Sequence, residues 1–427
     1  MFKKYYSVHE QIKFYLSLFF ASSIILELVF TQINLKFIQS LAFYLLILQL
    51  TISIIIIMLF IYKYKPQKFG LNTSFKLYNI IKKLNRELVN AHIYFETHSN
   101  TVKTPQIKFI LDNNNLIIII KNSIKFHEKL DKLDISSALS DFIVERQYLS
   151  NDRNSYIFET YLVNTKTLIF NKLENYLSWC KETSNRYEIR LDERTTVLLH
   201  HLGLAAQTGG GKSFALQMLF YQLQNKEHKF YISDSKRADL YYLAERHLEE
   251  TYYADLYTTS ELINRFYNDM IKRQKELEKF FINNPNRDYR HANLPALILC
   301  IDEYGSYAEY CKLLDKKERD RIEMQLSSIA FLGRQLGCFL WITSQQINAK
   351  TLKTSTSEQL VLKIVLAESD EQTYRTLFSS SVSIPKVKFK PGQGVFSYPS
   401  IASIDKPRFI TLPHCKFLED TVSIIQD

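Results

Sequence analysis

The sequence predicts an α/β protein whose main domain is a mostly parallel sheet flanked by helices. Three patterns predict this: two long apolar runs open the chain, a pair of short β-patterned runs follows, and later an apolar strand enters a glycine-rich turn. We therefore expect a membrane anchor at residues 1–68, a small α+β module at 69–186 and the main domain at 187–427.

The composition favours an anionic partner. The 427 residues include 54 Lys and Arg against 44 Asp and Glu, a formal net charge of +10. Such an excess suits a polyanion or an anionic membrane surface without choosing between them. The five cysteines have no CxxC spacing and no paired histidines, which argues against a zinc site or a disulfide scaffold and fits a reducing compartment.

The predicted anchor consists of two apolar runs, at about residues 14–33 and 41–62, with a short link at 34–40. Each run is long enough to cross a hydrocarbon core of about 30 Å as a helix. Lysines precede the first run and follow the second, so the positive-inside rule predicts a multi-pass protein of the cell membrane with both termini in the cytoplasm. Glu27 is expected near the outer end of the first span, at the headgroups; a functional intramembrane carboxylate is the alternative.

The next segment contains β-patterned runs and no chemical motif. Residues 107–111 and 116–120 flank Asp112-Asn113-Asn114-Asn115, which predicts a hairpin. A helix is expected around 75–91 and a further strand at 156–163. The pattern assigns no ligand to this module.

The strongest local signal is LGLAAQTGGGKS at 202–213, followed by an amphipathic stretch at 214–224. This is the layout of a phosphate-binding loop, in which backbone N–H groups hold phosphates, Lys212 reaches the β and γ oxygens and Ser213 holds Mg²⁺. The predicted nucleotide-binding residues are Ala206, Gln207, Thr208, Gly209, Gly210, Gly211, Lys212 and Ser213. Ala206 replaces the first glycine of GxxxxGK[ST], so a plain glycine turn before a helix is the alternative.

A second strand, at 297–301, ends in Asp302 and Glu303. Because parallel strands end at one edge of a sheet, these carboxylates should lie near the glycine turn. We expect Asp302 to hold Mg²⁺ and Glu303 to polarise the attacking water; a core strand followed by a solvated acidic turn is the alternative. A third strand, at 339–343, is followed by Gln345, whose amide can touch a γ-phosphate or the attacking water.

In order along the chain, several blocks make the sequence resemble the FtsK/SpoIIIE branch of P-loop ATPases, with a RecA-like motor domain. The blocks are AAQTGGGKS, ISDSKRADL at 232–240, Met270 with Arg273, LILCIDEYGS at 297–306, IAFLGRQLGCFLWITSQQ at 329–346, residues 369–377 and GQGVF at 392–396. Ser235 stands where the family has proline.

The resemblance implies roles for particular residues. It implies ATP contacts at Gly211, Lys212 and Ser213, Mg²⁺ near Asp302, Glu303 as the catalytic carboxylate and Gln345 as a nucleotide sensor. It also implies hexameric rings with ATP between subunits and a catalytic arginine acting in trans. Arg375 and Arg334 both match arginines of the family blocks, and we favour Arg375.

With two predicted spans, one motor and a short segment after Gly394, the sequence is similar to TcpA-like coupling proteins of Gram-positive conjugative elements. The resemblance implies a membrane-anchored DNA translocase that delivers DNA to a transfer channel, with a relaxase and channel proteins as partners. Two alternatives stay open: an FtsK-like ATPase of a protein-export system, and a membrane adaptor that binds nucleotide without turnover.

Basic residues recur beside the motor blocks. We expect some of them to line the pore of a ring and to contact DNA phosphates without reading sequence; solvated helix faces or contacts with anionic lipid are the alternative. They are Lys236, Arg237, Lys272, Arg273, Lys275, Arg287 and Arg290.

Overall fold

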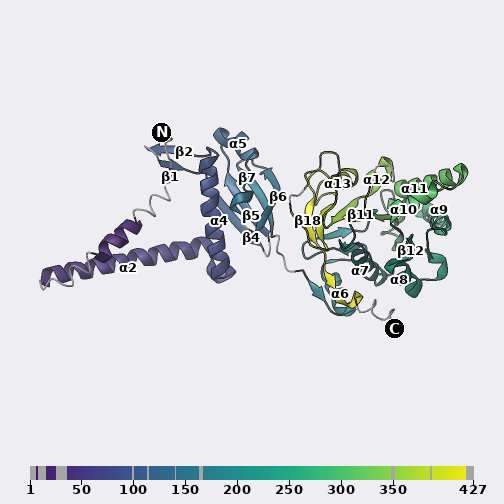
Figure 1. Cartoon of the computed structure of the whole chain (residues 1–427), viewed down its shortest axis with the longest axis horizontal. Coiled ribbons are helices and arrows are strands. Elements are labelled where there is room, and N and C mark those ends of the chain that lie inside the picture. The colour runs from purple at the N-terminus through teal and green to yellow at the C-terminus, as the bar shows by residue number, and fades with distance from the viewer. Residues whose placement is uncertain are drawn as a thin grey trace. The chain divides into compact units, whose positions relative to one another are not determined.

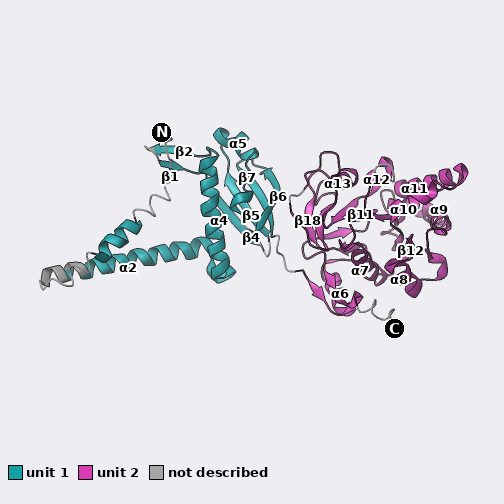
Figure 2. Ribbon diagram, viewed as in Figure 1, with its two compact units in different colours: residues 1–164 teal, residues 165–427 magenta. Residues whose placement is uncertain are grey.

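The computed structural model describes residues 6–7, 16–25, 36–98, 101–112, 115–139, 141–162, 167–347, 352–384 and 387–419. The chain forms two compact units, Met1–Asn164 and Thr165–Asp427 (Figure 1, Figure 2). The second unit begins earlier than the boundary at 187 that we expected, because helix α6 (Leu173–Thr183) packs Tyr176 and Cys180 into the core that contains the glycine-rich loop's strand.

One helix among the described residues is long and apolar enough to cross a membrane. Helix α2 (Lys36–Tyr64) contains this stretch, Phe43–Tyr64, which matches the second predicted span. The expected link at 34–40 is helical from Lys36 on, since neither Gly nor Pro interrupts it. Of the first predicted span, the structure describes a short apolar helix at Leu16–Ile25, which contacts α2 through a hydrogen bond from Gln49 Nε2 to Ser23 Oγ. Glu27 lies outside the described residues.

The end of α2 is built into the core of the first unit. Tyr64 is buried, its ring stacks on Phe109 at 5.8 Å, and its carbonyl accepts a hydrogen bond of 3.1 Å from Ser74 Oγ. The short helix α3 (Pro66–Phe69) then leads into α4 (Leu71–Asn90), which corresponds to the helix expected at 75–91. In Figure 1, α4 runs across the end of α2 rather than continuing it.

Helix α4 packs an apolar stripe against an antiparallel sheet of order β4-β5-β7-β6. Leu77, Leu84 and Leu88 lie at helical spacing on the buried face. The strands are β4 (Ile107–Asp112), β5 (Asn115–Lys121), β6 (Phe142–Leu149) and β7 (Ser155–Leu162). The hairpin and the later strand predicted from the sequence are therefore present. Smaller elements of this unit are β1 (Tyr6–Ser7), β2 (Phe95–His98), β3 (Thr101–Lys103), η1 (Ile124–Phe126), α5 (His127–Asp131) and η2 (Ser136–Ala138).

The second unit is built on an eight-stranded sheet of order β13-β12-β14-β15-β11-β16-β17-β18. The strands from β13 to β16 pair in parallel, and β17 and β18 continue the sheet in antiparallel pairing. The strands are β11 (Leu202–Ala206), β12 (Lys229–Asp234), β13 (Tyr253–Ala254), β14 (Leu297–Asp302), β15 (Cys338–Ser344), β16 (Leu362–Leu366), β17 (Gln393–Ser397) and β18 (Arg408–Thr411).

Helices cover both faces of this sheet. On β12, Phe230 contacts Phe220 of α7 at 4.9 Å between ring centroids, and the next residue, Tyr231, contacts Phe266 of α9 at 4.9 Å. Because successive strand residues point to opposite faces, α7 and α9 lie on opposite sides. The helices are α7 (Lys212–Gln224), α8 (Asp239–His247), α9 (Thr259–Asn283), α10 (Tyr304–Cys311), α11 (Lys316–Leu336), α12 (Thr354–Gln359) and α13 (Glu371–Leu377).

Helix α7 differs from the amphipathic helix that we predicted. Its residues from Ala215 to Phe220 are all buried, because α6 packs on the side away from the sheet, with a 3.2 Å hydrogen bond from Tyr176 Oη to the Met218 carbonyl. The remaining elements of this unit are β8 (Ile169–Phe170), β9 (Glu188–Arg190), β10 (Thr196–Leu198), η3 (Glu250–Tyr252), β19 (His414–Cys415) and η4 (Lys416–Leu418).

Candidate nucleotide-binding site

The glycine-rich turn between β11 and α7 needs its glycines. Gly209 and Gly211 have φ values of +78° and +98°, in the left-handed region that favours glycine. A Cβ on Gly210 would lie 2.9 Å from the Gln207 carbonyl oxygen, so that position too excludes a side chain. The turn therefore leaves its backbone open to close approach by a ligand, as a phosphate-binding loop requires.

Ala206 does not disturb this turn. It is the last residue of β11, is fully buried, and pairs in register with Leu366 of β16. Its φ is not positive, so this position has ordinary strand geometry that alanine adopts without strain. The departure from the strict glycine pattern is thus compatible with the loop.

A cavity of about 410 Å³ opens at the loop. The backbone N–H of Gly392 donates a 3.0 Å hydrogen bond to the carbonyl of Gly210, which places the GQGVF block beside the loop. The predicted nucleotide-binding residues that line the cavity are Ala206, Gln207, Thr208, Gly209, Gly211, Lys212 and Ser213, together with Gln345.

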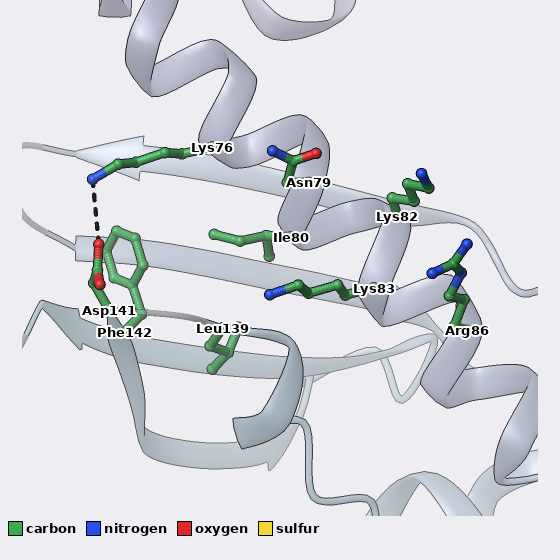
Figure 3. Close-up of a pocket in the computed structure, with 9 residues that line it drawn as sticks. All are labelled: Lys76, Asn79, Ile80, Lys82, Lys83, Arg86, Leu139, Asp141 and Phe142. Atoms are coloured by element: carbon green, nitrogen blue, oxygen red, sulfur yellow. Dashed lines mark hydrogen bonds and ion pairs between the residues drawn. The ribbon is translucent and has the colours of Figure 1, made fainter.

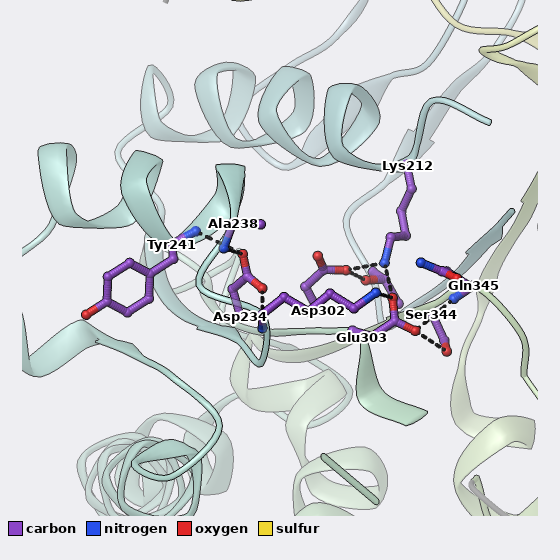
Figure 4. Close-up of polar contacts among 10 residues, drawn as sticks. Lys212, Asp234, Ala238, Tyr241, Asp302, Glu303, Ser344 and Gln345 are labelled. Atoms are coloured by element: carbon purple, nitrogen blue, oxygen red, sulfur yellow. Dashed lines mark hydrogen bonds and ion pairs between the residues drawn. The ribbon is translucent and has the colours of Figure 1, made fainter. Parts of the chain in front are cut away.

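Lys212 links the loop to the carboxylates at the end of β14 (Figure 4). Its Nζ lies 2.8 Å from Asp302 Oδ1 and 3.0 Å from Glu303 Oε2. Thr343 Oγ1 also donates a hydrogen bond to Asp302 Oδ1. The structure therefore brings together the lysine and both acidic residues that the sequence predicted for one site.

Burial and charge act in opposite directions on the ionisation of this cluster. Burial lowers the pKa of Lys212, but the charges and hydrogen bonds of Asp302 and Glu303 outweigh it, so the pKa lies above its usual value. Burial raises the pKa of Glu303, but the charge of Lys212 and hydrogen bonds from its neighbours outweigh burial and hold that pKa below its usual value. Lys212 is thus a cation and Glu303 an anion near neutral pH.

The backbone of Glu303 is strained. Its φ of 52° and ψ of 50° are left-handed, which is uncommon for a residue with a side chain, and it stands immediately before α10. Oε1 of this residue accepts hydrogen bonds of 3.3 Å from both Ser344 Oγ and the Gln345 N–H. Such strain persists only where the surroundings over-determine it, as they do at many catalytic residues.

Gln345 reaches the site because β15 lies between β11 and β14 in the sheet. Its side chain lines both the loop cavity and an adjoining depression that Glu303 also lines. The predicted sensor position is therefore located between the glycine-rich loop and the acidic end of β14.

Lys236 belongs to the same cluster, a contact that we did not predict from the sequence; we placed Lys236 only among residues expected to meet DNA. Asp234, at the end of β12, accepts hydrogen bonds from the N–H groups of Lys236, Ala238 and Tyr241 at 3.0, 2.9 and 3.2 Å. This turn carries Lys236 Nζ to 3.2 Å from Glu303 Oε2. The signal was available in ISDSKRADL, a second polar strand end at the same edge.

Other members of the basic group have structural partners. Arg273 donates to the carbonyls of Pro295 and Leu336, Arg290 pairs with Asp288, and Arg237 lies over the ring of Tyr241. These contacts within the chain give Arg273 and Arg290 a structural role, and the role of the basic group in a central pore stays a prediction. The members that are exposed are Lys236, Arg237, Lys272, Lys275 and Arg287, whereas Arg273 and Arg290 are half-buried.

Neither candidate arginine lies among the residues that line the loop cavity. Arg375 is half-exposed on α13, pairs with Glu371 and donates to the Ser380 carbonyl at 2.6 Å. Arg334 is exposed near the end of α11, shortly before β15 begins, and so lies at the sheet edge opposite the loop.

The residues at this site fit a magnesium ion. Ser213 offers a hydroxyl at the cavity wall and Asp302 a carboxylate at the adjacent strand end, and hard oxygen ligands of this kind suit Mg²⁺ when phosphate oxygens complete the shell.

No family model matches the chain. Over 196 residues, or 46% of its length, the chain is 26% identical to the FtsK domain-containing protein YdcQ of Bacillus subtilis strain 168, and the match spans only 40% of that relative. Among solved structures, it is similar to the pCW3 conjugation coupling protein TcpA with ATPγS, with a TM-score of 0.48, 17% identity and coverage of 76% of this chain and 93% of that one. A second is EssC (ATPases 2 and 3) from Geobacillus thermodenitrificans, at a TM-score of 0.41, 18% identity and coverage of 56% and 49%. The resemblance to FtsK-type ATPases inferred from the motifs is confirmed by the curated relative.

Proposed function

We propose that this protein is a membrane-anchored, ATP-driven DNA translocase, and that it acts as the coupling protein that delivers DNA to a conjugative transfer channel. The observation that carries the proposal is the convergence of Lys212, Asp302 and Glu303 beside a glycine loop that leaves its backbone open. That arrangement supports ATP hydrolysis. The motif blocks resemble the FtsK/SpoIIIE family, as the similarity to an FtsK domain-containing protein does, and this resemblance implies DNA as the substrate to be moved.

In this mechanism the loop and Lys212 bind the phosphates of ATP. Lys212 exchanges its two carboxylate partners for phosphate oxygens, whose charge it offsets. Mg²⁺ held by Ser213 and Asp302 would supply further positive charge to the transferring phosphoryl group.

Glu303 acts on the attacking water. When Lys212 turns to phosphate, Lys236, Ser344 and the Gln345 N–H still hold the carboxylate of Glu303 in place. A carboxylate fixed in this way orients the water by hydrogen bonding, while the side chain of Gln345 responds to the γ-phosphate.

The membrane part of the proposal rests on α2. We propose that both apolar segments, about 14–33 and 41–62, cross the cell membrane as a hairpin with both termini in the cytoplasm. The hydrogen bond from Gln49 to Ser23 supports pairing of the two helices, since polar side chains in apolar surroundings seek one another. The motor unit would then face the cytoplasm, where ATP is available.

We further propose a hexameric ring of RecA-like motor domains with ATP between subunits and Arg375, or failing that Arg334, acting in trans. The mostly parallel sheet supports the RecA-like assignment. Exposed basic residues of the motor unit would contact DNA in the ring, and a relaxase and channel proteins would be the protein partners.

The test is ATP turnover by the full-length protein in nanodiscs, with duplex DNA, with single-stranded DNA and with neither. The full chain is needed because removing residues 1–68 would delete Tyr64 from the core of the first unit. We expect severalfold stimulation by one form of DNA, and none in Glu303→Gln. Turnover that ignores both forms would favour a protein-export ATPase, and binding of ATP without any turnover would favour an adaptor.

A further inference from the structure

A cationic pocket lies beside α4 in the first unit (Figure 3). Its volume is about 310 Å³, and it is bounded by α4 on one side and by residues around the start of β6 on the other. Figure 3 shows Lys83 extending from α4 toward Leu139 and Phe142, so its ammonium group lies over an apolar wall. The basic residues that line the pocket are Lys76, Lys82, Lys83 and Arg86.

Two of the four basic side chains of this pocket, Lys82 and Lys83, form no ion pair with a carboxylate of the described residues. Asp141 is the only carboxylate among the pocket's lining residues, and it already pairs with Lys76 at 3.2 Å. Lys82 also lies one helical turn from Arg86, a spacing at which like charges destabilise a helix, whereas Lys83 has both Arg86 and Glu87 one turn away. A bound anion would relieve this repulsion.

The pocket lies close to the end of the candidate membrane span. Tyr64, the last residue of that span, is held to α4 by the hydrogen bond from Ser74 and by an edge contact with Tyr78 at 5.7 Å. Since α4 runs across the end of α2 (Figure 1), its whole length would stay near the membrane surface if α2 spans the bilayer as proposed.

The beginning of α4 has the composition of a membrane interface. Leu71 and Phe75 are exposed, at 66% and 54%, and exposed lysines at positions 65 and 68 precede them. Apolar side chains next to lysines at the end of a span are typical of the headgroup region. An anion in the nearby pocket would therefore come from the bilayer surface.

We propose that this pocket binds the phosphate-bearing headgroup of an anionic phospholipid. Lys83 contacts the phosphate, Lys82 adds positive charge from the side of the pocket near Arg86, and the apolar wall formed by Ile80, Leu139 and Phe142 accepts the glycerol backbone (Figure 3). This inference rests on the proposed membrane anchoring and is independent of ATP turnover and DNA.

The test uses full-length protein in a non-ionic detergent and counts bound molecules by native mass spectrometry. The probes are short-chain phosphatidylglycerol, short-chain phosphatidylcholine and glycerol phosphate. We expect phosphatidylglycerol to bind more tightly than phosphatidylcholine, and Lys82→Gln with Lys83→Gln to weaken its binding by about tenfold or more. Asp141→Asn, which removes the opposing carboxylate, should tighten it.

The matched control is Lys65→Gln with Lys68→Gln, which removes the same charge nearer the span but outside the pocket and should leave most of the binding. If both double variants lost lipid binding equally, the lipid would be attracted by positive charge in general and not bound in the pocket, and the proposal would be wrong. Displacement of the lipid by glycerol phosphate at equal concentration would overturn the membrane as the source.

The same samples separate this inference from the proposed function. Basal ATP turnover should be unchanged in Lys82→Gln with Lys83→Gln, because neither lysine lies at the nucleotide site. If DNA stimulates ATP turnover but the protein binds phosphatidylglycerol and phosphatidylcholine equally, only the lipid inference is wrong. Selective lipid binding by a protein that ignores DNA would support the inference and count against the translocase.

Discussion

Lys236 Nζ lies 3.2 Å from Glu303 Oε2, on the same carboxylate oxygen that Lys212 contacts at 3.0 Å. The two lysines differ in where they come from: Lys212 belongs to the phosphate-binding loop, and Lys236 to the turn after β12. In the proposed mechanism phosphate draws Lys212 away, and Lys236 is then the cation that remains on Glu303. We therefore expect Lys236 to be a positioning residue for the carboxylate proposed to act on water.

Replacement of Lys236 should lower kcat without changing the affinity for ATP. In Lys236→Ala, Glu303 loses one charged hydrogen bond, and we expect kcat to fall by about tenfold while KM for ATP stays within about twofold. Steady-state ATP turnover measures both. Lys236→Arg should restore part of kcat, and Arg237→Gln, next to it but stacked on Tyr241, should leave kcat unchanged. A rise in KM alone would show that Lys236 binds nucleotide instead.

Replacing Glu303 and replacing Lys212 should affect ATP binding and ATP turnover differently. Glu303→Gln keeps ATP bound but lowers turnover by about a hundredfold or more, because it removes the base and not the phosphate contacts. Lys212→Ala should lose both binding and turnover, because no other described lysine or arginine lines the loop cavity. Equilibrium binding of a fluorescent ATP analogue separates the two outcomes. Full turnover in Glu303→Gln would mean that another group is the catalytic carboxylate.

The sequence predicted those parts of the site that are contiguous. The glycine loop, the acidic end of β14 and Gln345 each follow an apolar run, so their common edge follows from parallel pairing alone. The contact of Lys236 with Glu303 was not predicted, because it depends on the turn that Asp234 holds and on β12 lying next to β14. Neither fact can be read from local periodicity.

Local sequence patterns also could not predict which residues are buried by segments distant in the sequence. Helix α7 appeared amphipathic because its polar residues include Gln217 and Gln222, yet both are buried. The side-chain amide of Gln222 forms two hydrogen bonds with the backbone of Arg190. Its oxygen accepts one of 3.0 Å from the Arg190 N–H, and its nitrogen donates one of 3.1 Å to the Arg190 carbonyl. The sequence alone also could not show that the loop accepts alanine at position 206. The register of β11 against β16 shows this, because Ala206 pairs there as an ordinary strand residue.

An arginine acting in trans predicts complementation between inactive subunits. Arg375→Ala should bind ATP normally and hydrolyse it about a thousandfold more slowly. Mixing it with Lys212→Ala subunits should recover activity, because some interfaces then combine an intact loop from one subunit with an intact arginine from the other. ATP turnover across a series of mixing ratios measures this recovery. Wild-type turnover in Arg375→Ala would move the assignment to Arg334.

His201 should make the motor unit sensitive to acid. Burial lowers its pKa to about 3, and its Nδ1 accepts a 2.8 Å hydrogen bond from the Leu340 N–H. In the unfolded chain His201 binds a proton below about pH 6.5, whereas in the folded protein it stays neutral down to about pH 3. The contribution of His201 to the free energy of unfolding is therefore greatest above about pH 6.5. Below that pH it falls by up to about 1.4 kcal/mol per pH unit. His228, whose pKa burial lowers to about 4, acts in the same direction.

The variant that isolates this effect is His201→Asn, whose amide oxygen can replace Nδ1 as acceptor. We expect it to be less stable than the wild type at pH 8 but to lose less stability between pH 6.5 and 4.5, as followed by the thermal unfolding midpoint. His291→Asn, a change at a partly exposed histidine paired with Asp288, is the control and should keep the wild-type slope. An unchanged slope in His201→Asn would assign the acid sensitivity to other groups.

DNA binding should depend on phosphate charge and on exposed lysines of α9. Lys272 and Lys275 are exposed, whereas Arg273 between them is held by backbone carbonyls, so the two lysines are the members of the predicted basic group on α9 that are available to a polyanion. Binding should fall steeply with salt, because each phosphate contact releases counterions, and it should be similar for two unrelated duplexes. Lys272→Gln with Lys275→Gln should lower the slope of log K against log salt by roughly one to two.

The control is Lys316→Gln with Lys317→Gln, an exposed pair at the start of α11. It removes the same charge elsewhere and should change the slope less. Fluorescence anisotropy of the full-length protein across a salt series gives all three slopes, and equal slopes would exclude α9 as the DNA-contacting helix.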